Sequence, residues 1–147
     1  MEIKPISSSD IESLSRIFFA EKNEYIKYFL PFKSKEELKK LILQARKDKF
    51  FLIIHEKDMV GYVSLRGLDD GYKNPRFGIF ISEKYSGKGY GYSASKEIIK
   101  IAVDSGSYEY IDLKVDPKNY KAIKLYEKLG FEFHCLEGQE NVMILHI

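Results

Sequence analysis

Three glycines at alternate positions, Gly87, Gly89 and Gly91, are the residues of this chain best suited to phosphate chemistry. They follow an apolar, strand-like run and a short polar turn, and a helical pattern begins behind them. Such a turn can present several backbone N–H groups to one anion, and the dipole of the helix start adds to the attraction. Glycine is needed there because a side chain would hold phosphates away from the backbone. Residues 79–92 therefore predict a pyrophosphate site.

Two other phosphate-binding loops do not fit this segment. The P-loop needs a Gly-Lys-Ser/Thr sequence after a first glycine and four further residues, and that pattern is absent. The dinucleotide fingerprint fails because Tyr92 stands where its last glycine belongs. An ordinary glycine-rich turn between a strand and a helix stays open, so the loop alone does not identify a ligand.

A second segment, residues 115–131, narrows the choice. Its spaced residues are Asn119, Ala122, Tyr126, Gly130 and Phe131. Together with the glycine segment it resembles the GNAT superfamily of acyl-CoA N-acyltransferases, whose second motif reads Asn-x-x-Ala-x-x-x-Tyr-x-x-x-Gly-Phe. The phosphate motif of that family, Arg/Gln-x-x-Gly-x-Gly/Ala, is matched by residues 86–91, except that Ser86 stands in its first position. The resemblance covers residues 50–147.

The resemblance implies an enzyme that transfers an acetyl group from acetyl-CoA to a primary amine by direct attack in a ternary complex. Residues 76–102 are most similar to the branch that acetylates ribosomal-protein N-termini, spermidine and amino sugars. The expected partner is therefore a small-molecule amine or a protein N-terminal amine. Backbone N–H groups around Phe80 and Ile81, where the strand of this family splays from its neighbour, are expected to bind the oxyanion and the pantetheine arm. The expected cofactor-binding residues are Ile79, Phe80, Ile81, Gly87, Lys88, Gly89, Tyr90, Gly91, Tyr92 and Asn119.

The resemblance also implies a catalytic role for Tyr126. Residues seven apart on a helix project from nearly the same side, so Asn119 and Tyr126 share a face with the small Ala122 between them. A thiolate of pKa about 8.5 leaves more easily when protonated, and a tyrosine hydroxyl of pKa about 10 can donate that proton. Spacing alone favours a plainer interpretation, in which Asn119 caps the helix and Tyr126 belongs to its buried stripe. Both can hold together.

The general base does not follow from the sequence. Many members of the family carry a glutamate where this chain has Arg76 or Lys114. The nearby carboxylates are Asp69, Asp70, Glu83 and Asp112, and loss of the proton to water is equally open. The two basic residues keep a catalytically idle acyl-CoA-binding module as an alternative, and a nucleotide-binding protein of another kind is a third hypothesis.

Residues 21–33 are implied by the same resemblance to shape the acceptor pocket. Glu21 and Glu24 would attract a cationic amine there. The aromatic residues that would wall it are Tyr25, Tyr28, Phe29 and Phe32. These residues also suit a plain core or surface role, and they do not identify the acceptor.

Composition agrees with a small enzyme of one domain, residues 1–147, long enough for a two-layer core. The net charge of +2 gives no reason to invoke nucleic acid. Basic residues do gather near the two motifs: Lys84, Lys88, Lys114, Lys118, Lys121, Lys124 and Lys128. They suit an anionic ligand or, equally, a solvated helix face.

The small numbers of cysteines and histidines, and the lengths of the apolar runs, bear on the compartment and partners of the protein. Cys135 is its single cysteine, which excludes an internal disulfide and favours a reducing compartment. His55, His134 and His146 lack metal-ligand spacing, so we expect no metal. No apolar run reaches the roughly 18 residues of a membrane span. We expect a cytoplasmic protein without membrane contact, and a homodimer is compatible with these data.

The pattern of apolar residues predicts a mixed α/β fold of the α+β type. Its GNAT-like form would have about seven strands, mostly antiparallel with a central parallel pair, flanked by about four helices. Expected strands cover residues 2–6, 50–55, 60–65, 77–81, 110–115, 131–136 and 142–147. Expected helices follow caps near Ser8 and Ser34 and cover 93–105 and 120–129. Lys57-Asp58 is the expected turn of the first hairpin.

Overall fold

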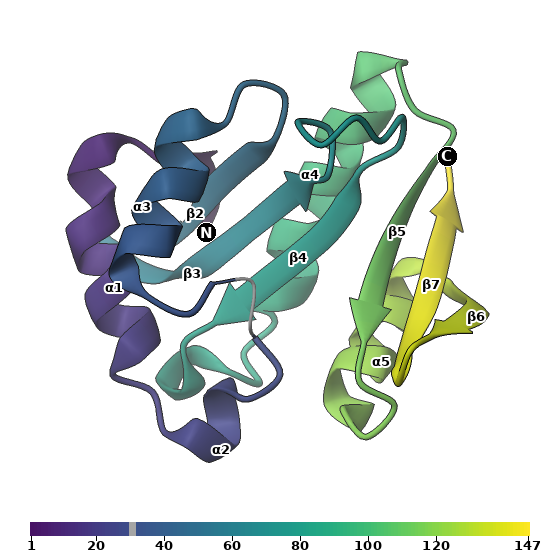
Figure 1. The fold of residues 1–147 in the computed structure, drawn as a ribbon. Coiled ribbons are helices and arrows are strands. Elements are labelled where there is room, and N and C mark those ends of the chain that lie inside the picture. The colour runs from purple at the N-terminus through teal and green to yellow at the C-terminus, as the bar shows by residue number, and fades with distance from the viewer. Residues whose placement is uncertain (30–31) are drawn as a thin grey trace.

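Seven strands form one sheet in the computed structural model, which describes residues 1–29 and 32–147 (Figure 1). The strands are β1 (Glu2–Pro5), β2 (Lys49–His55), β3 (Asp58–Arg66), β4 (Arg76–Ile81), β5 (Tyr110–Val115), β6 (Glu132–Glu137) and β7 (Glu140–His146). The helices are α1 (Ile11–Phe19), α2 (Asn23–Ile26), α3 (Lys35–Gln44), α4 (Tyr90–Ser105) and α5 (Tyr120–Leu129). Short 3₁₀ turns, η1 (Ser8–Asp10) and η2 (Glu83–Tyr85), precede α1 and the glycine loop.

The strand order β1-β2-β3-β4-β5-β7-β6 confirms the expected mixed sheet. In the described part of the chain only β4 and β5 run parallel, and each of the other neighbouring pairs is antiparallel. A parallel pair needs a crossover connection, which α4 supplies between β4 and β5. The sheet is therefore two antiparallel halves joined at one parallel seam.

Each face of the sheet has its own hydrophobic cluster. On one face, α1 and α3 contribute Leu14, Phe18 and Leu38, which pack with Tyr62 and Phe80 of the sheet. On the other face, the residues in contact come from α4, α5 and alternate strand positions: Val63, Leu65, Phe77, Ala94, Ile98, Leu113, Tyr126 and Phe131. Figure 1 shows α1 and α3 in front of the sheet and α4 behind it. Successive side chains of a strand point to opposite faces of the sheet, so the same strands contribute residues to both clusters.

The parallel seam is short. β3 and β4 are paired from Gly61–Ile81 to Arg66–Arg76, whereas the ladder between β4 and β5 consists of the single pair Arg76–Asp112. Beyond Arg76 the two strands diverge, as Figure 1 shows from top to bottom. One edge of β4 is consequently left without a strand partner along residues 77–81.

Three local expectations differ from the structure. The first hairpin turns at Glu56 and Lys57, both with positive φ, because Asp58 is already paired with His55. Helix α4 starts at Tyr90 rather than at residue 93, since Gly89 takes the left-handed conformation that serves as its N-cap. Helix α2, only one turn long, was not among the expected elements, and with it the described residues form five α-helices where about four were expected.

Within the described ranges, every helix is too short or too polar to span a bilayer.

Asn119 is the N-cap of α5, and its side-chain oxygen accepts a hydrogen bond from the Ala122 N–H at 3.3 Å. Ser34 caps α3 in the same way through the Glu37 N–H at 3.1 Å. These two caps were predicted from residue type and spacing.

Candidate active site

The open edge of β4 presents alternate backbone groups to the gap between β4 and β5. The Ser82 N–H donates to the Val60 carbonyl at 2.8 Å, and the Asp112 N–H donates to the Pro75 carbonyl at 3.1 Å. Because backbone groups alternate along a strand, the N–H of Phe80 faces β3, while those of Ile79 and Ile81 face the gap. Ile79 and Ile81 therefore carry N–H donors that no strand partner uses.

Phe80 is placed apart from the other expected cofactor residues. Its ring is fully buried on the α1–α3 face, 4.9 Å from the ring of Phe18 and 5.3 Å from that of Phe29. Its backbone belongs to the ladder with Tyr62 of β3. The splay was expected from the resemblance, but the alternation that assigns the free donors to Ile79 and Ile81 needed the observed register.

The glycine loop adopts a backbone that requires glycine. Gly87 has φ +76° and Gly89 has φ +86°, a region that residues with a side chain rarely adopt. A Cβ atom at either position would have open space around it, so backbone conformation and not crowding within the protein selects glycine. Gly89 leads directly into α4, whose first N–H groups have no acceptor inside the helix. The loop and helix start together fit an anionic phosphate group.

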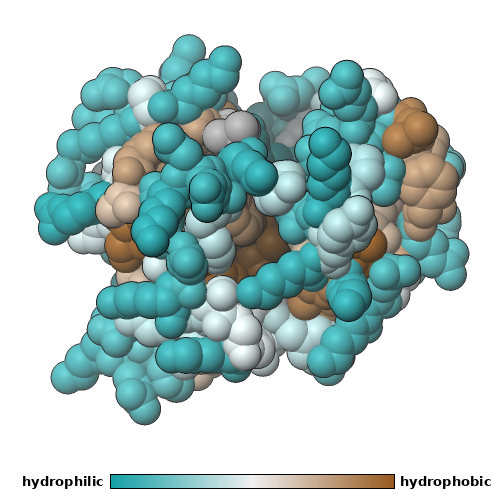
Figure 2. Space-filling model, turned by 90° about the horizontal axis from the view of Figure 1, so that it is seen from below, coloured by the Kyte–Doolittle hydropathy of each residue, from teal (hydrophilic) through white to brown (hydrophobic). Residues whose placement is uncertain are grey.

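A cavity of about 390 Å³, which we call the glycine-loop cavity, lies between this loop, the open edge of β4, α2 and α5. The expected cofactor residues on its wall are Ile79, Ile81, Gly87, Gly89, Tyr90, Gly91, Tyr92 and Asn119. Lys88 is not on that wall, and its ammonium lies 5.8 Å from the centre of the Tyr85 ring. Figure 2 shows the lower face of the molecule hollowed, with hydrophobic surface at the bottom and a hydrophilic rim.

Lys121 is a residue of this cavity that sequence reasoning did not single out. Its ammonium reaches from α5 to the glycine loop and donates to the Ser86 hydroxyl at 3.1 Å. Ser86 is the position at which the chain departs from the basic or amide residue of the phosphate motif. The basic side chain of Lys121 thus lies beside the position where the basic motif residue is missing. In the sequence, Lys121 is one of several lysines near the two motifs, and nothing else distinguishes it.

A second cavity, of about 970 Å³, covers the sheet face formed by β3, β4 and β5, and we call it the sheet-face cavity. Its walls share five residues with the glycine-loop cavity: Tyr28, Phe29, Ile79, Asn119 and Tyr126. The two cavities therefore meet in the gap between β4 and β5. A ligand held by the glycine loop can reach a second ligand that enters from the opposite face.

Tyr126 lies at this junction. It is 8% exposed, and its ring makes edge contacts with Phe77 and Phe131, at centroid distances of 6.0 and 6.1 Å. Burial raises the pKa of the Tyr126 hydroxyl above the ordinary value, so the group stays protonated at neutral pH. In the described part of the chain no hydrogen bond engages this hydroxyl, so its proton can be donated to a group in the cavity.

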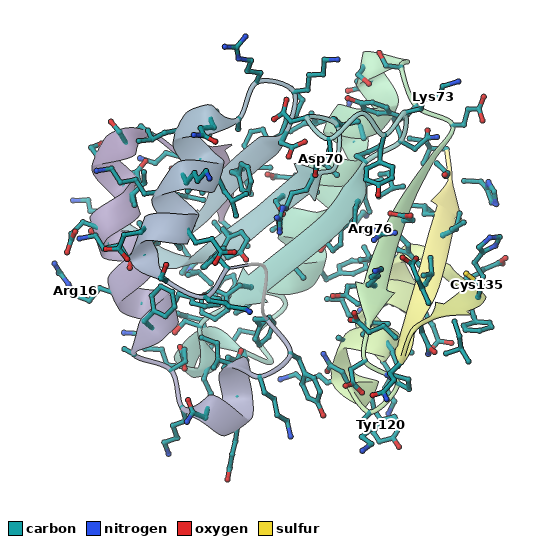
Figure 3. The ribbon with its side chains drawn as sticks, viewed as in Figure 1. Arg16, Asp70, Lys73, Arg76, Tyr120 and Cys135 are labelled. Atoms are coloured by element: carbon teal, nitrogen blue, oxygen red, sulfur yellow. The ribbon has the colours of Figure 1, made fainter. Side chains whose placement is uncertain are left out.

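The two basic residues in the usual base positions are held in ion pairs. The Arg76 guanidinium donates two hydrogen bonds of 3.0 Å to the Asp112 carboxylate, and the Lys114 ammonium lies 3.0 Å from Glu137. The charge and hydrogen bond of Lys114 hold the pKa of Glu137 below its usual range. Figure 3 shows Arg76 extending from β4 toward β5. Asp112 is occupied by this pairing rather than free as a base.

The other expected carboxylates are also placed by the structure. Asp69 accepts hydrogen bonds from three backbone N–H groups of residues 46–48, which lower its pKa, so it fixes a loop. Glu21 accepts from the Ser82 hydroxyl at 2.8 Å and from the Glu83 N–H at 3.1 Å. Glu21 therefore anchors the end of β4 instead of facing an acceptor. Asp70 lines the sheet-face cavity.

The expected acceptor segment divides between core and wall. Phe32 is buried beside Phe18 in the α1–α3 cluster. Tyr28 and Phe29 line both cavities, and Tyr25 lines the glycine-loop cavity and donates a hydrogen bond from its hydroxyl to the Ile81 carbonyl. Burial, together with Glu21 and Glu83, raises the pKa of Tyr25 to about 12, so this donor stays protonated.

Among the described residues, no three His, Cys, Asp or Glu side chains form a metal-binding group.

The family description "Acetyltransferase (GNAT) domain" matches residues 1–132 of the chain. The protein therefore belongs to the GNAT acetyltransferase family, as the two motifs predicted. The spermine/spermidine N(1)-acetyltransferase of Bacillus subtilis (strain 168) is 34% identical over 89 residues, which cover 56% of this chain and 58% of that protein. The chain thus spans little more than half the length of this relative.

Solved structures share the fold. A domain from Methanocaldococcus jannaschii DSM 2661 superposes with a TM-score of 0.82 at 22% identity, covering 99% of this chain and 97% of that one. RimL, a ribosomal L7/L12 alpha-N-protein acetyltransferase solved in complex with coenzyme A, has a TM-score of 0.79 at 17% identity. That comparison covers 99% of this chain and 93% of RimL.

Proposed function

We propose that the protein transfers the acetyl group of acetyl-CoA to a primary amine by direct attack in a ternary complex. The observation that carries this proposal is the meeting of two cavities at Tyr126, one ending at the glycine loop and the other open on the opposite sheet face. A two-substrate reaction needs both ligands within contact distance at one point. The family and a relative that acetylates spermine or spermidine support the same reaction class.

The proposed acetyl-CoA site uses the glycine-loop cavity. Backbone N–H groups of the loop and of the start of α4 would hold the pyrophosphate, and Lys121 would supply the positive charge that Ser86 lacks. The pantetheine arm would lie along the open edge of β4 and pair with Ile79 and Ile81 as a short extra strand. The complex of RimL with coenzyme A, a protein of the same fold, supports this choice of ligand.

The transfer step follows from the groups at the junction. A neutral amine attacks the thioester carbonyl carbon, and a C–N bond forms as the carbonyl oxygen gains negative charge. The N–H group of Ile79, a residue on the walls of both cavities, would donate to that oxygen, while the N–H group of Ile81 would remain for the pantetheine arm. The C–S bond then breaks, and Tyr126 gives its proton to the departing thiolate. The attacking nitrogen carries an extra proton after the C–N bond forms. It loses that proton to water as the neutral amide is produced, and a proton from water restores the tyrosine hydroxyl.

Water is the proposed acceptor for the proton that the amine loses before attack. An alkylamine of pKa about 10.4 is mostly protonated at neutral pH, so this loss must precede the reaction. Asp112 is paired with Arg76 and Asp69 fixes a loop. Among the described residues this leaves Asp70 and Glu83 as the expected carboxylates without an ion pair, and of these two Asp70 lines the sheet-face cavity. A base acting through water does not require direct contact with the amine.

Thiol release from acetyl-CoA, measured across a panel of primary amines with mass detection of the product, tests the function. The proposal expects release that depends on both the protein and an amine, with a product heavier by one acetyl group. Binding of acetyl-CoA without release for any amine would instead support an idle acyl-CoA-binding module. Binding of ATP or NAD without binding of CoA would support a nucleotide-binding protein of another kind.

A further inference from the structure

We propose that the amine acceptor carries an anionic group, a carboxylate or a phosphate, and that Arg66 binds it. This inference rests on the acetyl transfer proposed above and concerns the sheet-face cavity. It assigns a class of acceptor different from the polycations named for the relative from Bacillus subtilis.

Arg66 is a basic residue of this cavity that lies next to another positive charge and has no carboxylate partner among the described residues. It lies directly opposite Arg76 across the β3–β4 ladder, so two guanidinium groups are neighbours on one sheet face. Like charges placed directly opposite each other across a ladder are destabilising. Arg76 is neutralised by Asp112, but within residues 1–29 and 32–147 no carboxylate lies within 4.0 Å of the Arg66 guanidinium.

Arg66 lies on the wall of the sheet-face cavity, next to buried residues of β3. Tyr62, Ser64 and Arg66 are alternate residues of β3 and line the cavity together. Gly78 of β4 lies beside them, and a Cβ atom there would come within 2.9 Å of the Ser64 hydroxyl oxygen. The absence of a side chain at Gly78 therefore leaves room for the Ser64 hydroxyl, and both residues lie on the cavity wall. A guanidinium with a planar fork of donors suits a carboxylate or phosphate better than a single hydrogen bond does.

The charge of the whole cavity does not favour a polycation. Five basic and four acidic side chains line it, so its wall carries no negative excess. Two of the basic residues, Arg76 and Lys114, are held by Asp112 and Glu137. Figure 3 shows Asp70 and Lys73, one of each sign, in the upper part of the molecule, with Arg76 below them. A site selective for a polyamine would need unpaired carboxylates in excess.

The distance along β4 sets the expected size of the acceptor. Arg66 is paired with Arg76, and the donor Ile79 is three residues farther along the strand. At about 3.3 Å per residue, the anion and the reacting amine would be roughly 10 Å apart. An extended tripeptide spans about that distance between its two termini, whereas a single amino acid is too short without help from the flexible arginine side chain.

Matched acceptors test the charge requirement directly. The tripeptide Ala-Ala-Ala is compared with its C-terminal amide, and glucosamine 6-phosphate with glucosamine, so that the two arms separate carboxylate from phosphate. Spermidine is the polycation. We expect the anionic member of at least one pair to have a kcat/KM at least tenfold above that of its neutral partner and above that of spermidine. Preference for spermidine, or equal use within both pairs, would overturn the proposal.

Variants locate the requirement. Arg66→Gln should bring the ratio of anionic to neutral kcat/KM close to one, and Arg66→Lys should keep part of the preference. Arg16→Gln, at an exposed position of α1 on the left of Figure 3, is the matched control and should leave the ratio unchanged. An undiminished preference in folded Arg66→Gln would overturn the role of Arg66. If that variant does not fold, Arg66→Lys and the acceptor pairs on the native chain decide.

Binding separates this inference from the proposed function. Calorimetry of each acceptor against the protein saturated with CoA needs no turnover. If no amine is acetylated, the proposed function fails, and tighter binding of the anionic member by the native chain than by Arg66→Gln still supports the anion site. Equal binding of anionic and neutral members by the native chain contradicts it.

Discussion

The glycine-loop cavity and the sheet-face cavity meet at Tyr126, but different kinds of chemical groups line them. Half of the wall of the first comes from residues 79–92, which include the three glycines of the loop, the open backbone edge of β4 and the start of α4. The second is lined by charged side chains from β3, β4, β5 and the loops around them. Main-chain donors suit any ligand of the right shape and charge, whereas charged side chains on separate strands suit particular ligands. In the proposed reaction, cofactor and acceptor recognition would therefore depend on separate sets of residues.

The largest effect is expected at the junction itself. Tyr126→Phe should lower kcat by roughly 10²-fold, in the range for loss of a general acid, while acetyl-CoA affinity stays nearly unchanged because the ring is kept. Steady-state rates with a good amine acceptor and a melting curve measure both quantities. Tyr108→Phe, packed against the same hydrophobic cluster but outside both cavities, is the control. Native turnover in the Tyr126 variant would remove this residue from the mechanism and leave it a core residue.

The next effect tests whether the glycine-loop cavity holds the cofactor. Gly89→Val should weaken acetyl-CoA binding by more than tenfold, because a side chain would enter the space of the phosphates and strain a backbone with φ +86°. Gly106→Val is a matched control at the other end of α4, since Gly106 has φ +66° and equally open surroundings.

Calorimetry with acetyl-CoA distinguishes the two glycine variants. Both should lose stability through the same backbone strain, but only Gly89→Val should lose affinity. Equal affinities of the two folded variants would mean that the loop does not contact the phosphates.

A smaller effect is expected for Lys121. Lys121→Met should raise the Kd for acetyl-CoA about three- to fivefold and reduce its dependence on salt, since an exposed charge pair contributes up to about 1 kcal/mol. Lys124→Met, on the same helix and exposed, should change neither quantity. A titration at two salt concentrations gives both values. Identical behaviour of the two lysine variants would show that the bridge to Ser86 has no role in cofactor binding.

The smallest effect concerns the tie between α2 and the end of β4. Tyr25→Phe removes the hydrogen bond to the Ile81 carbonyl and should cost about 1 kcal/mol of unfolding free energy. The pKa of Tyr25 is about 12 in the folded chain, and the ordinary value is about 10. Between these values the unfolded chain loses the proton first, so stability falls as pH rises.

Denaturant unfolding between pH 8 and pH 12 measures this contribution. The loss of stability above pH 10 should be shallower for Tyr25→Phe than for the native chain, although Tyr62 and Tyr126, whose pKa values burial also raises, keep part of it. Parallel curves for the two proteins would contradict the burial of this hydroxyl in the folded state.

Much of the fold was readable because its signals are local. The caps Ser34 and Asn119, the glycines that start α4 and the apolar runs of β2 and β3 each depend on neighbours a few residues away. The hairpin turn was misplaced by one residue because Glu56 and Lys57 are unusual occupants of positive φ. Helix α2 escaped notice because a single turn shows no periodicity.

The sequence by itself determined the family, the phosphate-type loop and the helix that presents Asn119 and Tyr126, because each is a pattern at fixed spacing along one segment. Only the tertiary structure decided which β4 donors are free, since the pairing register determines whether the N–H of Phe80 or that of Ile81 faces β3. It also brought Lys121 to Ser86, paired Arg76 with Asp112 and placed Arg66 beside Arg76. Such contacts join residues far apart in the chain, and their geometry exists only once the sheet has formed.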